Sequence, residues 1–380
     1  MKKLISLLLL TALLGWANAQ TDLTVDQLLE KGRNAEQLGL MDRAQSYYQE
    51  AQTADPENPN AYYHLGLLYE CRYHYGQAAN QFRQAIALSD TFAAAYEHLA
   101  YCMIENKETA DLESLTQIAE KAVELNPKSA SAYASMALIN VEQKNFTNAI
   151  TWAKRAIEAD ARSPRAYNAL GVIYYHRGND NEAIQQFRKA LQADPKNIDA
   201  YYNLGVMYVL RNNHETAINY LKKGLNIDNK STKLYYYLGV AYIQRGDAQK
   251  AIACYETIIQ QIDSTFVPAY NRLGAIYCSK GDYEKATAYH QKATRIDPSD
   301  PESYKCLGKV NMDRGDLVKA LRNYQKAVQL NDKDHETYCL IAKLYAKQGN
   351  SARETSSYKK AAKLGNKEAQ KWMVSKGMAW

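Results

Sequence analysis

The 380-residue sequence has little of what would mark an enzyme or a metal-binding domain. Its six cysteines include no Cys-x-x-Cys pair, which excludes the zinc ribbons and thioredoxin-like sites that need this spacing. It also lacks a phosphate-binding glycine loop, a Gly-x-Ser-x-Gly turn and a His-Glu-x-x-His motif. We therefore expect no catalytic site, no metal and no cofactor.

Phenylalanine and tryptophan are also scarce, with 5 and 4 residues, whereas there are 31 tyrosines. Tyrosine combines a large apolar ring with a polar hydroxyl, which suits surfaces that are packed on one side and wet on the other. A chain of this length is too long for one ordinary hydrophobic core. It must therefore form several domains or a repeat array.

The first residues have the pattern of a secretory signal peptide. Lysines at positions 2 and 3 precede an apolar stretch over residues 4–14, and an Ala-Asn-Ala run ends at Ala19. The stretch is too short to span a bilayer comfortably. We expect residues 1–19 to be removed, so that Gln20 becomes the first residue of a periplasmic or secreted protein with no transmembrane segment.

Tyrosine recurs at intervals of about 34 residues. Leu-Gly or Leu-Ala follows most of these tyrosines three residues later, and further small residues follow at fixed spacings. Glycine fits the left-handed position that ends a helix, proline starts the next unit, and small residues on facing helices allow close packing. The pattern predicts stacked helix pairs. The recurring tyrosines are Tyr62, Tyr96, Tyr133, Tyr167, Tyr201, Tyr235, Tyr270, Tyr304 and Tyr338.

This pattern resembles that of the tetratricopeptide repeat family, with Tyr where the family consensus has Trp. The resemblance implies an all-α fold, a right-handed superhelical solenoid of ten helix-turn-helix repeats. A short segment, 20–24, would precede the repeats, and a capping helix, 369–380, would cover the last open face. The repeats would span 25–58, 59–92, 93–129, 130–163, 164–197, 198–231, 232–266, 267–300, 301–334 and 335–368. We interpret extra residues around 105–112 and around 262–266 as loop variation.

The resemblance also implies a concave wall lined by positions 5, 9 and 12 of each first helix, where a protein or peptide would bind. In the middle repeats these positions are uncharged; the alternative interpretation is that they simply pack between neighbouring helices. Charged residues flank them, Arg33 and Glu36 in the first repeat and Lys305 and Lys309 in the ninth. A charged clamp for a carboxyl-terminal peptide is not matched, because Leu340 follows. The candidate groove residues are Leu138, Val141, Asn168, Val172, Tyr175, Tyr202, Val206, Val209, Tyr236, Val240 and Ile243.

Two pairs of residues suggest other chemistry. His64 and His98 hold the same position in adjacent repeats and could share a metal, but no third ligand is evident, so we interpret them as polar groove residues. Cys306 and Cys339 are close in register on adjacent first helices. We do not expect a disulfide there, because facing helices hold their Cα atoms beyond the bridging limit of about 7 Å.

Charge is distributed unevenly. Residues 20–129 contain 8 Lys or Arg and 17 Asp or Glu, whereas residues 343–376 contain 9 and 2. This is either solvated surface or an electrostatic contact at each end for a partner or an anionic surface. The basic end includes Lys359, Lys360, Lys363, Lys367 and Lys371.

The function that we predict is a non-enzymatic scaffold for protein–protein interaction in the cell envelope or outside the cell. Two alternatives remain: a structural subunit of an envelope assembly that uses its charged ends, and a binder of envelope polysaccharide. We expect no nucleic-acid partner, because the middle of the wall carries no positive charge.

Overall fold

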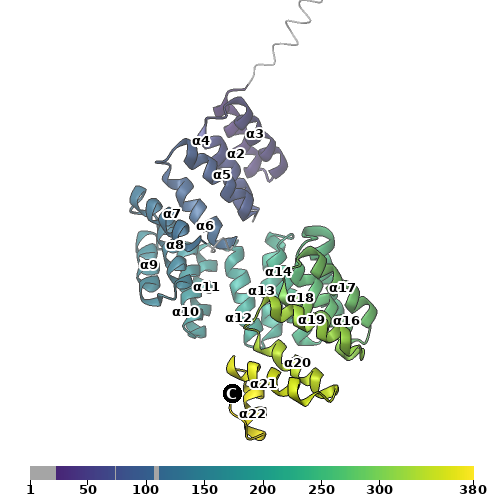
Figure 1. Cartoon of the computed structure of the whole chain (residues 1–380). Helices are drawn as coiled ribbons and strands as arrows, with labels where there is room; N and C mark the ends of the chain where they lie inside the picture. The colour runs from purple at the N-terminus through teal and green to yellow at the C-terminus, as the bar shows by residue number, and fades with distance from the viewer. Residues whose placement is uncertain (1–22, 73, 107–110) are drawn as a thin grey trace, which may run out of the picture. The chain divides into compact units, whose positions relative to one another are not determined.

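The computed structural model describes residues 23–72, 74–106 and 111–380, and every regular element within these ranges is a helix (Figure 1). Consecutive helices pack as antiparallel pairs, and within each of the two units described below successive pairs stack. The predicted all-α solenoid class is therefore confirmed. The chain divides into two compact units, Met1–Ala200 and Tyr201–Trp380, and one helix crosses the division.

The first unit contains α2 to α11 and the start of α12, which crosses into the second. Its helices are α2 (Val25–Gln37), α3 (Met41–Ala54), α4 (Pro59–Cys71), α5 (Tyr75–Leu88), α6 (Ala93–Glu105), α7 (Leu112–Leu125), α8 (Ala130–Glu142), α9 (Phe146–Ala159), α10 (Pro164–His176), α11 (Asp180–Ala193) and α12 (Ile198–Leu210). We call the even-numbered helices up to α14 the first helices of their pairs.

The second unit continues the same arrangement. Its helices are α13 (His214–Ile227), α14 (Thr232–Arg245), α15 (Ala248–Thr257), the π-helix η2 (Ile258–Ile262), α16 (Val267–Ser279), α17 (Tyr283–Ile296), α18 (Pro301–Asp313), α19 (Leu317–Leu330), α20 (His335–Lys347), α21 (Ser351–Lys363) and α22 (Lys367–Ser375). Here α14, α16, α18 and α20 are first helices.

Local sequence signals set the helix ends. Ser163 precedes α10 and its side chain accepts a hydrogen bond from the amide of Ala166, while Pro164 occupies the first helical position, where no amide is needed. At the other end of a first helix, Gly246 has φ of 91°, a left-handed conformation that glycine adopts without strain. These signals turn the chain back sharply and give each pair its antiparallel arrangement.

The core of each pair is built around one close approach. In α10, a Cβ atom added to Gly171 would lie 2.4 Å from the ring of Phe187 on α11, so the ring fills the space that the glycine leaves. Both residues are buried. In the preceding pair the same two positions hold Ala137 and Ala153, and both are fully buried. The sizes of the two facing residues are thus matched: glycine on the first helix faces a large ring, and alanine faces alanine.

The structure corrects one detail of the predicted repeats. The extra residue of the seventh repeat does not extend the loop at 262–266: the π-helix Ile258–Ile262 takes it up, and the amide of Asp263 donates to the carbonyl of Ile258 over 2.7 Å. The insertion therefore lies inside a helix. Of the extra residues around 105–112, positions 107–110 lie outside the described residues.

The last helix, α22, covers the end of the final pair. It buries Ala369 and Met373, and the ring of Trp372 stacks on Tyr358 with 4.4 Å between centroids. The helix spans Lys367–Ser375, whereas the predicted capping helix covers 369–380. It ends earlier because Gly377 adopts a positive φ of 68°.

Candidate functional site

The candidate groove residues of the first unit lie on α8 and α10. Val141 is 5% exposed and belongs to the hydrophobic core, so it is not available to a partner. Leu138 and Val172 are half-buried and pack against the same core. Asn168 donates its amide to Asn197 over 2.9 Å, which ties α10 to the segment before α12. Tyr175, at 40%, is the most exposed of these five side chains.

The candidate groove residues of the second unit lie on α12 and α14. Val209 is 3% exposed and is part of the core, so it too is withdrawn from the surface. Val206 and Val240 are half-buried, and Ile243 is 40% exposed. Two of the candidate groove residues, Val141 and Val209, are therefore buried inside the protein.

Aromatic rings dominate the wall of the second unit. Tyr202 and Tyr236 each pack edge-on against Tyr237, with centroids 5.3 and 5.4 Å apart. Tyr236 also contacts Phe266 and Tyr255, each at 5.8 Å. Tyr236 is thus in contact with three other rings, which restrict its freedom to move.

A cavity of about 500 Å³ opens beside Tyr236. The Nε of Arg272, on α16, donates to the Tyr236 hydroxyl over 3.0 Å, and the guanidinium lies 5.6 Å from the ring centroid. Arg272 forms no ion pair with any residue that the structure describes. The remaining lining residues are Val267, Pro268, Asn271, Ala275, Asp297, Asp300, Glu302 and Cys306. An aromatic ring, aliphatic side chains, one guanidinium without an ion pair and three carboxylates thus line one space.

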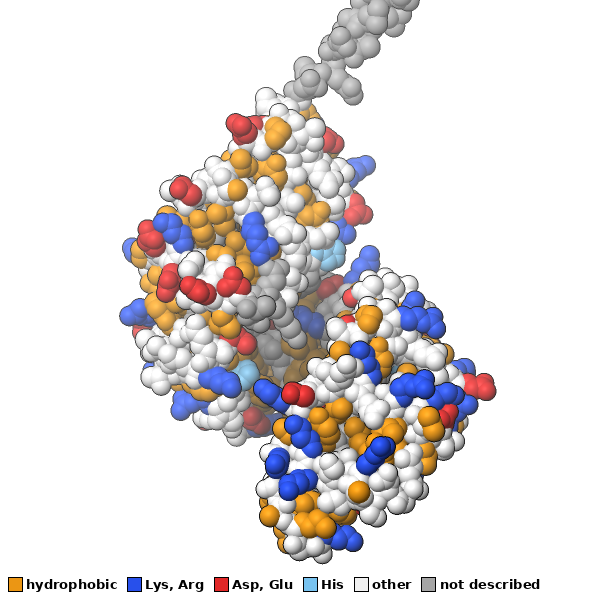
Figure 2. All heavy atoms as spheres, in the orientation of Figure 1, with side chains coloured by type: hydrophobic (Ala, Val, Ile, Leu, Met, Phe, Trp, Pro, Cys, Tyr) orange, Lys and Arg blue, Asp and Glu red, His pale blue; other side chains and the backbone are white. Residues whose placement is uncertain are grey.

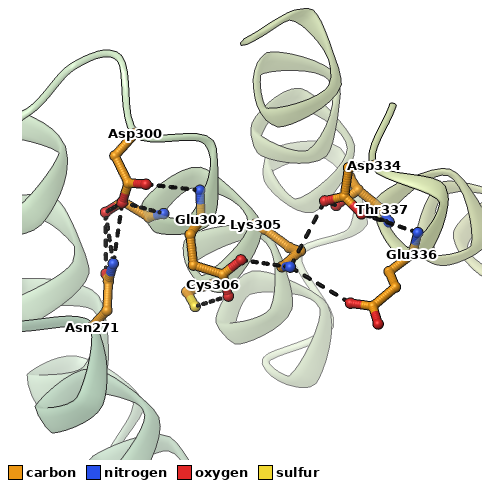
Figure 3. Close-up of polar contacts among 9 residues, drawn as sticks. Asn271, Asp300, Glu302, Lys305, Cys306, Asp334, Glu336 and Thr337 are labelled. Atoms are coloured by element: carbon orange, nitrogen blue, oxygen red, sulfur yellow. Dashed lines mark hydrogen bonds and ion pairs between the residues drawn. The ribbon is translucent and has the colours of Figure 1, made fainter. Parts of the chain in front are cut away.

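Polar contacts fix one side of this cavity, as Figure 3 shows. The amide nitrogen of Asn271 donates to Asp300 over 3.2 Å, and the Ser303 hydroxyl also donates to Asp300. Asp300 in turn caps α18 by accepting from the backbone amides of Glu302 and Ser303. The Asp300 carboxylate is therefore engaged within the protein.

The predicted charged flank at Lys305 is internally neutralised. Its amino group pairs with Glu302 and lies 3.7 Å from both Asp334 and Glu336 (Figure 3). Burial opposes the charge of Asp334, but the hydroxyl and backbone amide of Thr337, together with Lys305, lower the pKa of that carboxyl. Lys309, in contrast, is exposed. The ninth repeat thus uses Lys305 to hold α18 to α20.

The first unit contains a polar network that joins helices far apart in the sequence. Arg165, at the start of α10, pairs with Glu70 on α4, and its guanidinium lies 3.9 Å from the ring centroid of Tyr101 on α6. The Tyr101 hydroxyl donates to Asp199, at the start of α12, over 2.6 Å. We call these four residues the cross-repeat bridge.

The carboxylate of this bridge is buried and has two basic partners. The Glu70 side chain is only 11% exposed, and it also accepts from His98 Nδ1 over 2.7 Å. Burial opposes the charge of Glu70, but His98 and Arg165 outweigh it and lower the pKa of the carboxyl. A cavity of about 460 Å³ lies beside the bridge, with Leu67, Tyr75 and Ile198 among its lining residues.

This network was not predicted, because the wall was inferred from positions 5, 9 and 12 of the first helices. Position 2, the second residue of a first helix, is where the contacts begin. Arg165 and Asp199 hold this position in the bridge, and Glu302 and Glu336 hold it beside Lys305. The signal was present, since position 2 is charged in several consecutive repeats.

The two histidines considered for metal binding have other partners. His98 is bonded to Glu70, and His64 Nε2 lies 3.5 Å from Arg33 Nη1. Burial, and then the charge of Arg33, lower the pKa of His64. No group of three or more metal-ligating side chains comes together among residues 23–72, 74–106 and 111–380. Among the described residues, Cys306 and Cys339 are not joined by a disulfide.

The five lysines of the predicted basic end are all exposed, on α21 and α22. Within the described ranges, no helix combines the length and the apolar character that crossing a membrane requires. The apolar stretch at 4–14 lies outside those ranges.

Comparison with known protein families gives consistent matches along the chain. A TPR repeat model matches residues 173–210, 274–315 and 311–349. Three tetratricopeptide repeat models match residues 208–273, residues 29–70 and 113–164, and residues 335–367. No curated protein matches the sequence.

Solved structures share the fold at low sequence identity. Yeast Tom70 is 13% identical over 93% of this chain and 94% of its own, with a TM-score of 0.54. A tetratricopeptide repeat protein from Parabacteroides merdae is 21% identical over 65% of this chain and 98% of its own, with a TM-score of 0.53. A monomeric mutant of IFIT1 with m7Gppp-AAAA is 14% identical over 88% of this chain and 80% of its own, with a TM-score of 0.57.

Proposed function

The chain belongs to the tetratricopeptide repeat family, whose members are generally non-catalytic scaffolds for protein interaction, and we propose that it is an exported scaffold that binds a protein or peptide on the wall of its second unit. The observation that carries this proposal is the cavity beside Tyr236. Tyr and Arg side chains are the residues that most often dominate binding energy at protein interfaces.

The shape and chemistry of the wall favour a peptide segment with an apolar side chain and an acidic one. Val267, Pro268 and Ala275 offer aliphatic surface, and Arg272 offers a guanidinium without a carboxylate partner. A carboxylate of the ligand would form a bidentate pair with such a guanidinium. The exposed Ile243 and half-buried Tyr202 extend the uncharged surface on α14 and α12.

The first unit is less suited to this role, because the chain itself contacts its wall. Glu70 and Tyr101 hold wall positions on α4 and α6, and the cross-repeat bridge engages both. A ligand would have to displace a buried ion pair to reach them, and breaking such a pair costs about 3–5 kcal/mol. We therefore place the partner at the second unit.

Export is the second part of the proposal. It is supported by the two lysines, the apolar stretch over residues 4–14 and the Ala-Asn-Ala run that ends at Ala19. N-terminal sequencing of the protein recovered from outside the cytoplasm should find Gln20 as the first residue. Recovery of a chain that still begins at Met1 would contradict this part.

The binding proposal is tested by capturing partners from envelope extract with the mature chain and measuring the affinity of each one. We expect Tyr236→Ala and Arg272→Ala each to cost about 2 kcal/mol of binding free energy. The control is Tyr283→Ala, because Tyr283 is half-buried on α17, outside the cavity. Losses below about 1 kcal/mol for both variants, with unchanged melting temperatures, would place recognition elsewhere.

A further inference from the structure

The end of the second unit carries an exposed surface that the proposed groove does not use. Basic side chains, Lys or Arg, and hydrophobic ones lie next to each other on the part of this end that Figure 2 shows. We define the C-terminal face by the lysines Lys359, Lys360, Lys363, Lys367 and Lys371 and by the apolar residues Val374, Met378 and Trp380.

The positive charge of this face is not neutralised by the protein. None of the five lysines forms an ion pair with a residue that the structure describes; Lys360 lies 5.8 Å from the ring centroid of Tyr338. Residues 343–376 contain two acidic residues, Glu354 and Glu368, and Glu368 pairs with Lys343 at 2.9 Å. Five amino groups are therefore free to attract an anionic surface.

The face also exposes apolar side chains beside these charges. Val374 is 64% exposed, Met378 42% and Trp380 43%. On α22, Lys367, Lys371 and Val374 are spaced by four and three residues and so share one side of the helix. Ala369 and Met373, on the opposite side, are buried against α21. One side of α22 thus packs against the protein, and the opposite side faces solvent.

We infer that the C-terminal face binds the surface of an anionic phospholipid bilayer. The exposed cations around this end are mainly lysines, with Arg353 the exception on α21, and a lysine is a point charge on a flexible stem, which suits a diffuse anionic surface. Recognition of a discrete carboxylate on a protein more often uses the rigid fork of arginine. Trp380, Met378 and Val374 add the apolar contact, and tryptophan is enriched at the level of the lipid headgroups.

This combination of two weak signals gives reversible binding. Clustered lysines attract the headgroups over the screening length, and the apolar side chains enter the interface only after contact. The face is formed by α21, α22 and the residues after them, whereas the cavity beside Tyr236 is lined by residues of α14, of α16 and α18, and of the turn between α17 and α18. The inference is therefore independent of the proposed groove, and either can fail alone.

The test is sedimentation of the chain with lipid vesicles. The chain begins at Gln20, so that the apolar stretch 4–14 cannot itself bind lipid. Vesicles are made of phosphatidylcholine alone or of three parts phosphatidylcholine to one part phosphatidylglycerol. We expect binding to the mixed vesicles, little binding to the neutral ones, and loss of binding in about 1 M salt, where the screening length falls to about 3 Å.

Variants distinguish binding through the C-terminal face from a general effect of the net charge of the protein. Changing Lys359, Lys363, Lys367 and Lys371 together to Gln should weaken binding to the mixed vesicles by roughly 50-fold or more. The matched control changes Lys128, Lys154, Lys222 and Lys292 to Gln, four exposed lysines elsewhere, and should retain most of the binding. A double change of Val374 and Trp380 to Ser should weaken binding by roughly tenfold at unchanged charge.

Three results would overturn the inference. The first is equal binding to neutral and mixed vesicles. The second is an equal loss in the two quadruple variants, which would mean that net charge alone is responsible. The third is full binding by the Val374 and Trp380 variant together with equally tight binding to soluble polyglutamate, which would identify the face as a site for acidic polymers or proteins.

Discussion

Arg165 and Glu70 are 95 positions apart in the sequence, yet they form an ion pair that joins the fifth helix pair to the second. Contacts in a solenoid normally connect a repeat to its immediate neighbours. The pair is part of a bridge in which Asp199 accepts a hydrogen bond from Tyr101, 98 positions away. Side chains at the starts of α10 and α12 therefore connect the end of the first unit to its earlier helices α4 and α6.

Replacing Arg165 should destabilise the first unit strongly. In Arg165→Met the carboxylate of Glu70 stays buried with His98 as its main partner, so we expect a loss of about 2–4 kcal/mol in the free energy of unfolding. Adding Glu70→Gln should recover part of this loss. Urea unfolding of the two single variants and the double variant measures the coupling.

The control for this cycle is Arg155→Met. Arg155 lies over the ring of Trp152 at 4.8 Å, and the structure gives it no ion pair among the described residues. Its loss should stay below about 1 kcal/mol. If the Arg165 variant were no less stable than the Arg155 variant, the bridge would contribute nothing to the fold.

The match between Gly171 and Phe187 predicts a second coupling. Gly171→Ala places a methyl group where the ring now lies, 2.4 Å from it, and should cost about 2–3 kcal/mol. Phe187→Ala alone leaves a cavity and should cost about 3–5 kcal/mol. The double variant recreates the Ala137–Ala153 arrangement, so its loss should be at least about 1 kcal/mol smaller than the sum. Strictly additive losses in chemical unfolding would contradict a size match.

The turns between paired helices predict a stabilising substitution. Lys144 has φ of 60°, in a place where the next pair has Gly178 with φ of 78°. A side chain in this left-handed conformation is strained, so Lys144→Gly should raise the stability by about 0.5–1 kcal/mol. The reverse change, Gly178→Lys, should lower it by about 1 kcal/mol. Melting temperatures of both variants check the sign, and shifts in the same direction would refute this account.

His290 predicts a dependence of stability on pH. It is 1% exposed, packs against Gly274, and burial lowers its pKa to about 4. The unfolded chain, with a pKa near 6.5, binds the proton more readily than the folded one. Stability is therefore fully present above about pH 6.5 and falls between about pH 6.5 and 4, by up to about 3 kcal/mol.

The variant His290→Phe isolates this effect. Phe187 and Tyr324 fill the equivalent space in other pairs, so the ring should be accepted, although Asn271 loses its contact with His290 Nδ1, now 3.2 Å. Unfolding free energies measured from pH 7 to pH 4 should fall less steeply for the variant than for the natural chain. Parallel curves would assign the acid sensitivity to other groups.

Helix pairs, turns and the family could be predicted from the sequence because each depends on residues close together in the chain. Gly246 ends a helix and Pro164 begins one for reasons that lie within a few residues. The small residue of the first helix was recognised too. Its partner on the second helix, such as Phe187, was not, since the pairing becomes visible only when two helices are seen packed together.

The wall was harder to predict, because exposure depends on how neighbouring first helices pack. Val141 and Val209 hold wall positions by sequence register but lie in the core, whereas Tyr175 and Ile243 remain exposed. The cross-repeat bridge could not be predicted from the sequence for a related reason. Contact between the second and fifth pairs depends on small rotations that add up over the repeats between them, and no local pattern encodes that sum.

The π-helix at Ile258–Ile262 affects which insertions and deletions this repeat array can accept during evolution. One extra residue in an α-helix turns every later side chain by about 100° around the axis, which would swing a buried face into water. A single wide turn absorbs that rotation, so α16 still has its apolar side directed inward, with its own Leu273 and Ile276 buried. The repeat can thus gain or lose one residue here without disturbing the helices that follow, and length variation among relatives should concentrate at this turn.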